Sequence, residues 1–88
     1  MNGARSAYVK PPDELPAFPD ARKVRPKTVF AGGKRMRWRV AQTGMILEWD
    51  YRHGRIEAYN RAGRHLGEFD PVTGAQLKPA KPGHRVKP

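Results

Sequence analysis

Apolar and polar residues alternate along residues 45–59, with the period of a strand that is buried on one face. Gly54 lies within this stretch, and a glycine can supply the positive φ that a tight hairpin turn needs. We predict two strands joined by a two-residue turn at His53-Gly54, a register that places Asp50 opposite Glu57. One face then carries Leu47, Trp49, Tyr51, Ile56 and Ala58, and the other carries Glu48, Asp50, Arg52, Arg55, Glu57 and Tyr59.

A second alternating stretch covers residues 34–40, with apolar side chains on one face and arginines on the other. Residues 41–44 (Ala-Gln-Thr-Gly) are typical of a turn, so this strand is expected to pair with the one that follows. A four-residue loop sets Trp38 against Leu47 and joins the two apolar faces. The same register gives the arginines acidic neighbours, with Arg35 opposite Asp50 and Arg37 opposite Glu48.

Shorter strands are expected on both sides of this central pair. Residues 28–30, 64–69 and 75–78 are short β-prone stretches, and turn residues such as Asp70-Pro71 and Gly74 separate them. No long helix is predicted. The pattern therefore predicts an all-β fold, a highly twisted antiparallel meander with one apolar face, preceded by a short N-terminal helical turn or arm.

Residues 1–27 form a Pro-rich N-terminal arm or linker, and residues 28–88 form the functional domain. The arm contains Pro11, Pro12, Pro16, Pro19 and Pro26, a spacing that excludes a long helix or a central strand. At most one helical turn is expected, near residues 13–15 or 19–22. Tyr8, Leu15 and Phe18 are the side chains that can hold the arm against the domain.

Size and composition exclude several classes of protein. With 88 residues the chain is one small domain, and without cysteine it has neither disulfides nor a thiolate metal site. No apolar run approaches the roughly 20 residues of a membrane span, and the N-terminus lacks the apolar core of a signal peptide.

Charge is the strongest compositional signal. Eighteen Lys and Arg against eight Asp and Glu give a formal net charge of +10 and an isoelectric point near 10.7. Such a domain favours a polyanionic partner, either nucleic acid or an acidic protein. Membrane-surface binding is less favoured because no amphipathic helix is predicted, and an inert basic surface is the remaining alternative.

Asp50, His53 and Glu57 are the candidate catalytic residues. Two carboxylates facing each other on a sheet repel, which is unfavourable for a purely structural strand and useful for acid–base catalysis. The alternative is a solvated strand face in another register. On a basic sheet these groups suit metal-independent RNA cleavage, in which the ribose 2′-hydroxyl attacks the adjacent phosphate. A metal site built from the three is a weak signal, so we predict no metal and no cofactor.

Three ordered motifs resemble one protein family, the C-terminal cytotoxic ribonuclease domain of the cloacin and E-type colicin bacteriocins. They are Gly32-Gly33-Lys34-Arg35-x-Arg37-Trp38, Glu48-Trp49-Asp50-x-x-His53-Gly54-x-x-Glu57-x-Tyr59 and His65-Leu66-Gly67-x-Phe69-Asp70-Pro71-x-Thr73-Gly74-x-Gln76-Leu77-Lys78. The resemblance runs from about Pro26 to Lys78. It implies a toxin endoribonuclease that cuts 16S ribosomal RNA at the decoding A site and so blocks translation.

The resemblance also implies residue roles. Glu57 would be the general base, His53 the general acid and Asp50 an orienting group. The family's catalytic tail arginine aligns with His84 without a gap, and we expect the adjacent Arg85 to take that role. The expected RNA-binding residues are Lys34, Arg35, Arg37, Arg39, Arg52, Arg55, Tyr59 and His84.

The family implies partners and a place of action as well. The implied partners are the bacterial ribosome and an acidic cognate immunity protein. No membrane insertion by this domain is expected. We expect a monomer that forms the last domain of a larger toxin, secreted or delivered from its producer and acting in the cytoplasm of the target bacterium. Two alternatives stay open, a toxin that cleaves transfer RNA and a non-catalytic basic RNA-binding module.

Overall fold

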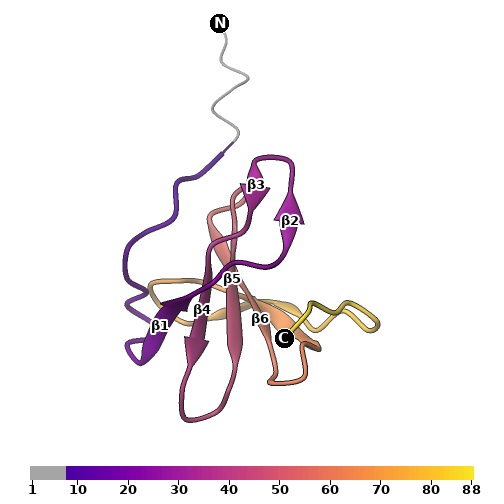
Figure 1. Ribbon diagram of the computed structural model, residues 1–88. Helices are drawn as coiled ribbons and strands as arrows, with labels where there is room; N and C mark the ends of the chain where they lie inside the picture. Colours follow the sequence, from indigo (N-terminus) through magenta and orange to yellow (C-terminus); the bar gives the residue numbers. More distant parts are fainter. Residues whose placement is uncertain (1–7) are drawn as a thin grey trace, which may run out of the picture.

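The described part of the computed structural model, residues 8–88, is built from strands that pair antiparallel (Figure 1). Six of these strands form one sheet in the order β1-β4-β5-β6-β7-β8, and two form a separate hairpin. Their bounds are β1 Ala21–Val24, β2 Val29–Phe30, β3 Gly33–Lys34, β4 Arg37–Val40, β5 Ile46–Asp50, β6 Arg55–Tyr59, β7 His65–Phe69 and β8 Gln76–Pro79. Residues 8–88 contain no helix, so the predicted all-β antiparallel class is confirmed.

The hydrophobic core lies on one face of the sheet, as the alternation predicts. Trp38, Leu47, Trp49, Ile56 and Ala58 point to this face from the three central strands, and each is at most 3% exposed. Leu15 of the N-terminal arm completes the cluster. Burial of these side chains from three adjacent strands provides the main favourable contribution to folding. Within residues 8–88, no helix is long and apolar enough to cross a membrane.

Strands β4 and β5 pair in the predicted register. Trp38 faces Leu47 and Arg37 faces Glu48. The backbone N–H of Val40 donates to the carbonyl of Met45 at 2.9 Å, so the intervening loop has the expected four residues.

The hairpin between β5 and β6 has a different turn from the predicted one. The predicted two-residue turn at His53-Gly54 is wrong, because residues 51–54 all belong to the turn and Asp50 pairs with Arg55. One Asp50 carboxylate oxygen accepts the backbone N–H groups of Arg52 and His53, and the Asp50 carbonyl accepts the N–H of Gly54. This side-chain cap starts the turn two residues earlier, and Gly54 closes it at a φ of 68°.

The observed register differs from the predicted one by two residues. Each side chain therefore stays on the predicted face of the sheet but has a different neighbour on the adjacent strand. The carboxylate opposite Glu57 is therefore Glu48, not Asp50. The predicted two-face assignment survives, since side chains alternate with a period of two.

The N-terminal arm contains a strand that the sequence analysis missed. The expected helical turn at residues 19–22 is wrong: Ala21 begins β1, which pairs with β4 at the edge of the sheet. Prolines exclude a central strand but allow an edge strand, and β1 fits between Pro19 and Pro26. Near residues 13–15 the chain forms a hydrogen-bonded turn, with the N–H of Phe18 bound to the carbonyl of Leu15. Residues 1–7 of the predicted arm lie outside the described residues, and the division at residue 27 stays a prediction.

The arm nevertheless lies against the domain at the predicted side chains. Leu15 is 4% exposed in the core, and Phe18 packs edge-to-face on Phe69. Tyr8 contacts Phe30 and Tyr51 at the other end of the arm. Figure 1 shows the arm running along the sheet, with the β2–β3 hairpin projecting beyond it.

Candidate functional site

A row of charged side chains crosses the sheet on the face opposite the core. Neighbouring strands place Arg37, Glu48, Glu57, Glu68 and Lys78 directly beside one another, from β4 to β8. Three carboxylates in a row repel one another unless each has a compensating partner. The partners of these carboxylates define the site.

Glu48 is neutralised inside the sheet. Its Oε2 accepts bonds from Arg37 Nη2 at 2.7 Å and Nε at 3.1 Å, and from the Thr28 hydroxyl at 2.6 Å. Both side chains of the ion pair are essentially inaccessible, at 0% and 1% exposed. Arg37, one of the expected RNA-binding residues, is therefore a buried structural partner and lies outside the accessible basic surface.

Glu57 is held by a histidine that the sequence analysis did not select. His65 Nε2 lies 2.7 Å from Glu57 Oε1, and His65 Nδ1 accepts the backbone N–H of Lys81 at 2.9 Å. Because a backbone N–H can only donate, this pattern assigns the proton of His65 to Nε2, which donates to Glu57. Burial raises the pKa of Glu57, the His65 bond lowers it and the charge of Glu68 raises it, which leaves the pKa above its ordinary value. A carboxyl with a raised pKa is a stronger base than an exposed one.

Asp50 and His53 form the second pair, on the β5–β6 turn. His53 Nδ1 lies 2.8 Å from Asp50 Oδ2, while Asp50 Oδ1 accepts the N–H groups of Arg52 and His53. Burial pushes the pKa of Asp50 upward, but the His53 bond and the two amide bonds outweigh it and hold the pKa below its ordinary value. An ionised Asp50 orients the ring through Nδ1, and His53, 49% exposed, keeps Nε2 for another proton acceptor or donor.

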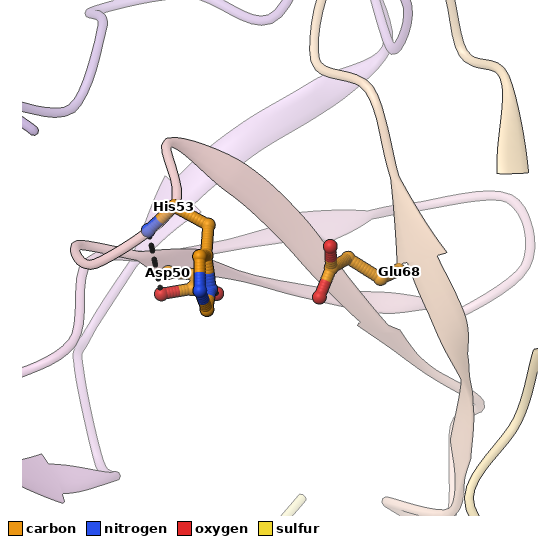
Figure 2. A group of neighbouring side chains, drawn as sticks. All are labelled: Asp50, His53 and Glu68. Atoms are coloured by element: carbon orange, nitrogen blue, oxygen red, sulfur yellow. Dashed lines mark hydrogen bonds and ion pairs between the residues drawn. The ribbon is translucent and has the colours of Figure 1, made fainter. Parts of the chain in front are cut away.

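Glu68 on β7 faces this pair across the site (Figure 2). Its Oε2 is 2.7 Å from Arg55 Nη1, and the carboxylate is 4% exposed. Donor atoms of Asp50, His53 and Glu68 lie within 4.8 Å of one another, so these are the described residues that could hold a cation. Both oxygens of Asp50 and one of Glu68 already accept hydrogen bonds, which organises the group without an ion.

The C-terminal segment closes one side of the site. His65 N–H donates to the carbonyl of His84, whose ring stacks on that of His65 at 4.7 Å and approaches the Tyr59 hydroxyl at 3.3 Å. Burial, followed by the neighbouring His65 and Lys81, lowers the pKa of His84. Tyr59 is only 3% exposed, and burial raises its pKa, so this expected RNA-binding residue lies beneath the tail.

An open cleft of about 530 Å³ lies between the turn, the sheet and this tail. It brings together the predicted Asp50, His53, Glu57 and His84 with the unpredicted His65 and Glu68. Arg85 does not line it. Arg85 is exposed opposite Arg64 and lines an adjacent cleft of about 390 Å³ that shares His65, Lys81 and His84 with the first.

The remaining predicted basic residues differ in accessibility. Lys34 on β3 and Arg52 on the turn are exposed. Arg35 donates to the Trp49 carbonyl at 3.1 Å and lies 5.7 Å from the centre of the Phe30 ring, and Arg39 donates to the Gly44 carbonyl at 3.2 Å. Arg55 forms an ion pair with Glu68.

Comparison with protein families shows a match that covers nearly the whole chain: residues 9–87 match the model of the family described as Cytotoxic. The chain belongs to the Cytotoxic family. The resemblance carried by the sequence motifs is thereby confirmed.

Curated relatives in this family come from Escherichia coli. The chain is 49% identical to colicin E3 over 57 residues, which is 64% of this chain and 10% of that protein. It is 38% identical to cloacin and to colicin-E6, in each case over 78 residues. The matched stretch is 85% of this chain and 14% of each relative. The chain thus spans a small part of the length of the relatives it matches.

The sequence analysis missed two residues of the candidate site, His65 and Glu68, because the positions of both depend on the β6–β7 register. The register shifts between Ala58 and Tyr59, which brings His65 opposite Tyr59 and Glu68 opposite Glu57. The signal in the sequence was Gly67, between the two residues, whose φ of 143° a side chain rarely adopts. A glycine inside a strand can mark such a bulge, but it does not say which residue is displaced.

Proposed function

We propose that this domain is an endoribonuclease that cleaves 16S ribosomal RNA at the decoding A site, without a metal ion, and so blocks translation. The observation that supports this most is the pairing of two acid–base couples, Glu57 with His65 and Asp50 with His53, around one cleft. The couples belong to a domain of net charge +10, which suits a polyanionic substrate.

In this reaction Glu57 removes the proton of the ribose 2′-hydroxyl. The 2′-oxygen forms a bond to the adjacent phosphorus, the bond from phosphorus to the 5′-oxygen breaks, and His53 gives that oxygen its proton. The products are a 2′,3′-cyclic phosphate and a free 5′-hydroxyl, so no water or cofactor is consumed. DNA lacks the attacking hydroxyl and is not a substrate.

Charge on the phosphorane-like transition state needs a cationic partner. Arg85 is exposed in the smaller cleft that shares His65 and His84 with the one lined by Glu57 and His53, and we assign it this role. Lys34 on β3 and Arg52 on the turn are exposed and would contact phosphates farther along the RNA.

The remaining proposals follow from the family. The domain would act in the cytoplasm of a target bacterium, as the toxic part of a longer secreted or delivered protein. An acidic immunity protein would neutralise it in the producer, and the net charge of +10 favours rapid capture by such a partner.

The test adds the domain to intact bacterial ribosomes and sizes the RNA on a gel. A Glu57→Gln variant keeps the shape of the base without its function, and Glu14→Gln, an exposed glutamate outside the cleft, is the matched control. One short 3′ fragment of 16S RNA from the wild type and the control, absent with Glu57→Gln, is the expected result. Intact 16S RNA with translation still blocked would indicate transfer RNA cleavage or simple binding instead.

Independence from metal is tested separately on a short RNA with the decoding-site sequence. Cleavage of this RNA is expected to continue at an unchanged rate in excess chelator. Loss of cleavage that added Mg²⁺ restores would contradict this part of the proposal.

A further inference from the structure

The N-terminal arm meets the turn that carries Asp50 and His53. The backbone N–H of Val9 donates to the Tyr51 carbonyl at 2.6 Å, and the indole N–H of Trp49 donates to the Val9 carbonyl at 2.8 Å. The main chain of Val9 therefore binds the two residues on either side of Asp50.

Side chains strengthen this contact. The Val9 side chain lies against Gly54, so closely that a Cβ on Gly54 would be 3.1 Å from Val9 Cγ1. The Tyr8 ring lies 6.3 Å from the ring of Tyr51, which itself stacks on Phe30 at 4.4 Å. The turn of residues 51–54 is thus held from outside at its first and last residues.

Neither Tyr8 nor Val9 lines the cleft. Their contacts lie on both sides of His53, whose ring is 49% exposed and for which the structure gives one side-chain bond, to Asp50. The position of the ring consequently depends on the backbone of the turn. We propose that Tyr8 and Val9 are positioning residues that hold the catalytic turn in its active geometry from outside the cleft.

The proposal rests on the proposed ribonuclease function for its kinetic effect. General acid catalysis needs the ring within hydrogen-bond reach of the leaving oxygen, and a displacement of about 1 Å can cost roughly 100-fold in rate. Loosening the arm should therefore lower kcat and change KM only slightly, because Arg52 is the one proposed RNA contact that lies on the turn, whereas Lys34 and Arg85 lie on other segments.

The experiment compares two neighbouring substitutions in the full chain. Val9→Pro removes the N–H that binds Tyr51. Lys10→Pro makes the same chemical change one residue later, where the N–H forms no hydrogen bond within residues 8–88. Two readouts are taken: kcat and KM for cleavage of the decoding-site RNA, and amide hydrogen exchange at Arg52, His53 and Gly54.

For Val9→Pro we expect kcat to fall about 10- to 100-fold, KM to stay within about twofold, and the three turn amides to exchange faster. Lys10→Pro should match the wild type in all three. Wild-type kcat, or unchanged exchange at the turn, in folded Val9→Pro would overturn the proposal, as would an equal effect of Lys10→Pro.

A second variant covers the case in which Val9→Pro does not fold. Val9→Gly keeps both backbone bonds but removes the packing on Gly54, and it should show a smaller fall in kcat with faster exchange at the turn; wild-type values of both would overturn the proposal. If the wild type itself does not cleave RNA, the proposed function fails, while hydrogen exchange at the turn still decides whether the arm holds it.

Discussion

Removing the charge of Glu48 should destabilise the domain more than any surface substitution. Glu48→Gln keeps the shape of the side chain but leaves the Arg37 guanidinium, 1% exposed, without an anion. Breaking a buried ion pair by losing one partner costs about 3–5 kcal/mol, because a buried charge stays uncompensated. Small domains have a total stability of roughly 5–15 kcal/mol, so a large share of it is lost.

Thermal unfolding followed by circular dichroism measures this effect. For a domain of this size, 1 kcal/mol corresponds to about 4–8 °C in Tm, so a loss of 3 kcal/mol lowers Tm by about 12–24 °C. Urea titration at 25 °C gives the free energy of unfolding independently.

Two further variants separate the ion pair from general disruption. Arg37→Met combined with Glu48→Met replaces the pair by apolar groups and should recover most of the lost stability. Arg39→Met is the control, since Arg39 is half-buried and, among the described residues, donates only to the Gly44 carbonyl; it should cost about 1 kcal/mol. A Glu48→Gln variant within 1 kcal/mol of the wild type, or a double variant less stable than Glu48→Gln, would refute the reasoning.

Three other predictions concern the same sheet. Glu68→Gln removes a charge that raises the pKa of Glu57, so the acidic limb of the pH–rate profile for RNA cleavage should move to lower pH. His65→Phe removes the bond that lowers the same pKa, so that limb should move to higher pH and kcat should fall; a shift in the same direction in both variants would contradict one of the two assignments. Gly67→Ala should lower Tm, because Gly67 has a φ of 143° and a Cβ there would lie 2.7 Å from the Lys78 carbonyl oxygen; an unchanged Tm in calorimetry would count against it.

Much of the fold could be predicted because alternation and turn composition are local signals. Trp38 against Leu47 followed from matching two apolar faces across a loop of known length. The β5–β6 turn could not be read in this way, because two registers that differ by two residues give identical faces. The Asp50 side chain decides between them through its hydrogen bonds, and alternation carries no information about such a cap.

The candidate site was predictable to the extent that its residues lie on one hairpin. Asp50, His53 and Glu57 do, and they reach the same cleft despite the corrected register. Glu68 and His65 come from β7, where a bulge determines which side chains face Glu57. The burial of Arg37 could not be predicted from the sequence either, because composition gives the number of arginines and not which of them have a buried partner.

The strand order has a consequence for how the chain folds. Strands β4 to β8 pair with one another in chain order, so each of these hairpins closes a short loop and can form early. Pairing of β1 with β4 encloses the β2–β3 hairpin, and the hydrogen bond of Trp49 to Val9 joins residues 40 positions apart. We therefore expect the meander to form first and the arm to dock last, so that newly made chains pass through a sheet whose β5–β6 turn is not yet fixed. In such molecules, refolding of the sheet and recovery of RNA cleavage would follow different time courses.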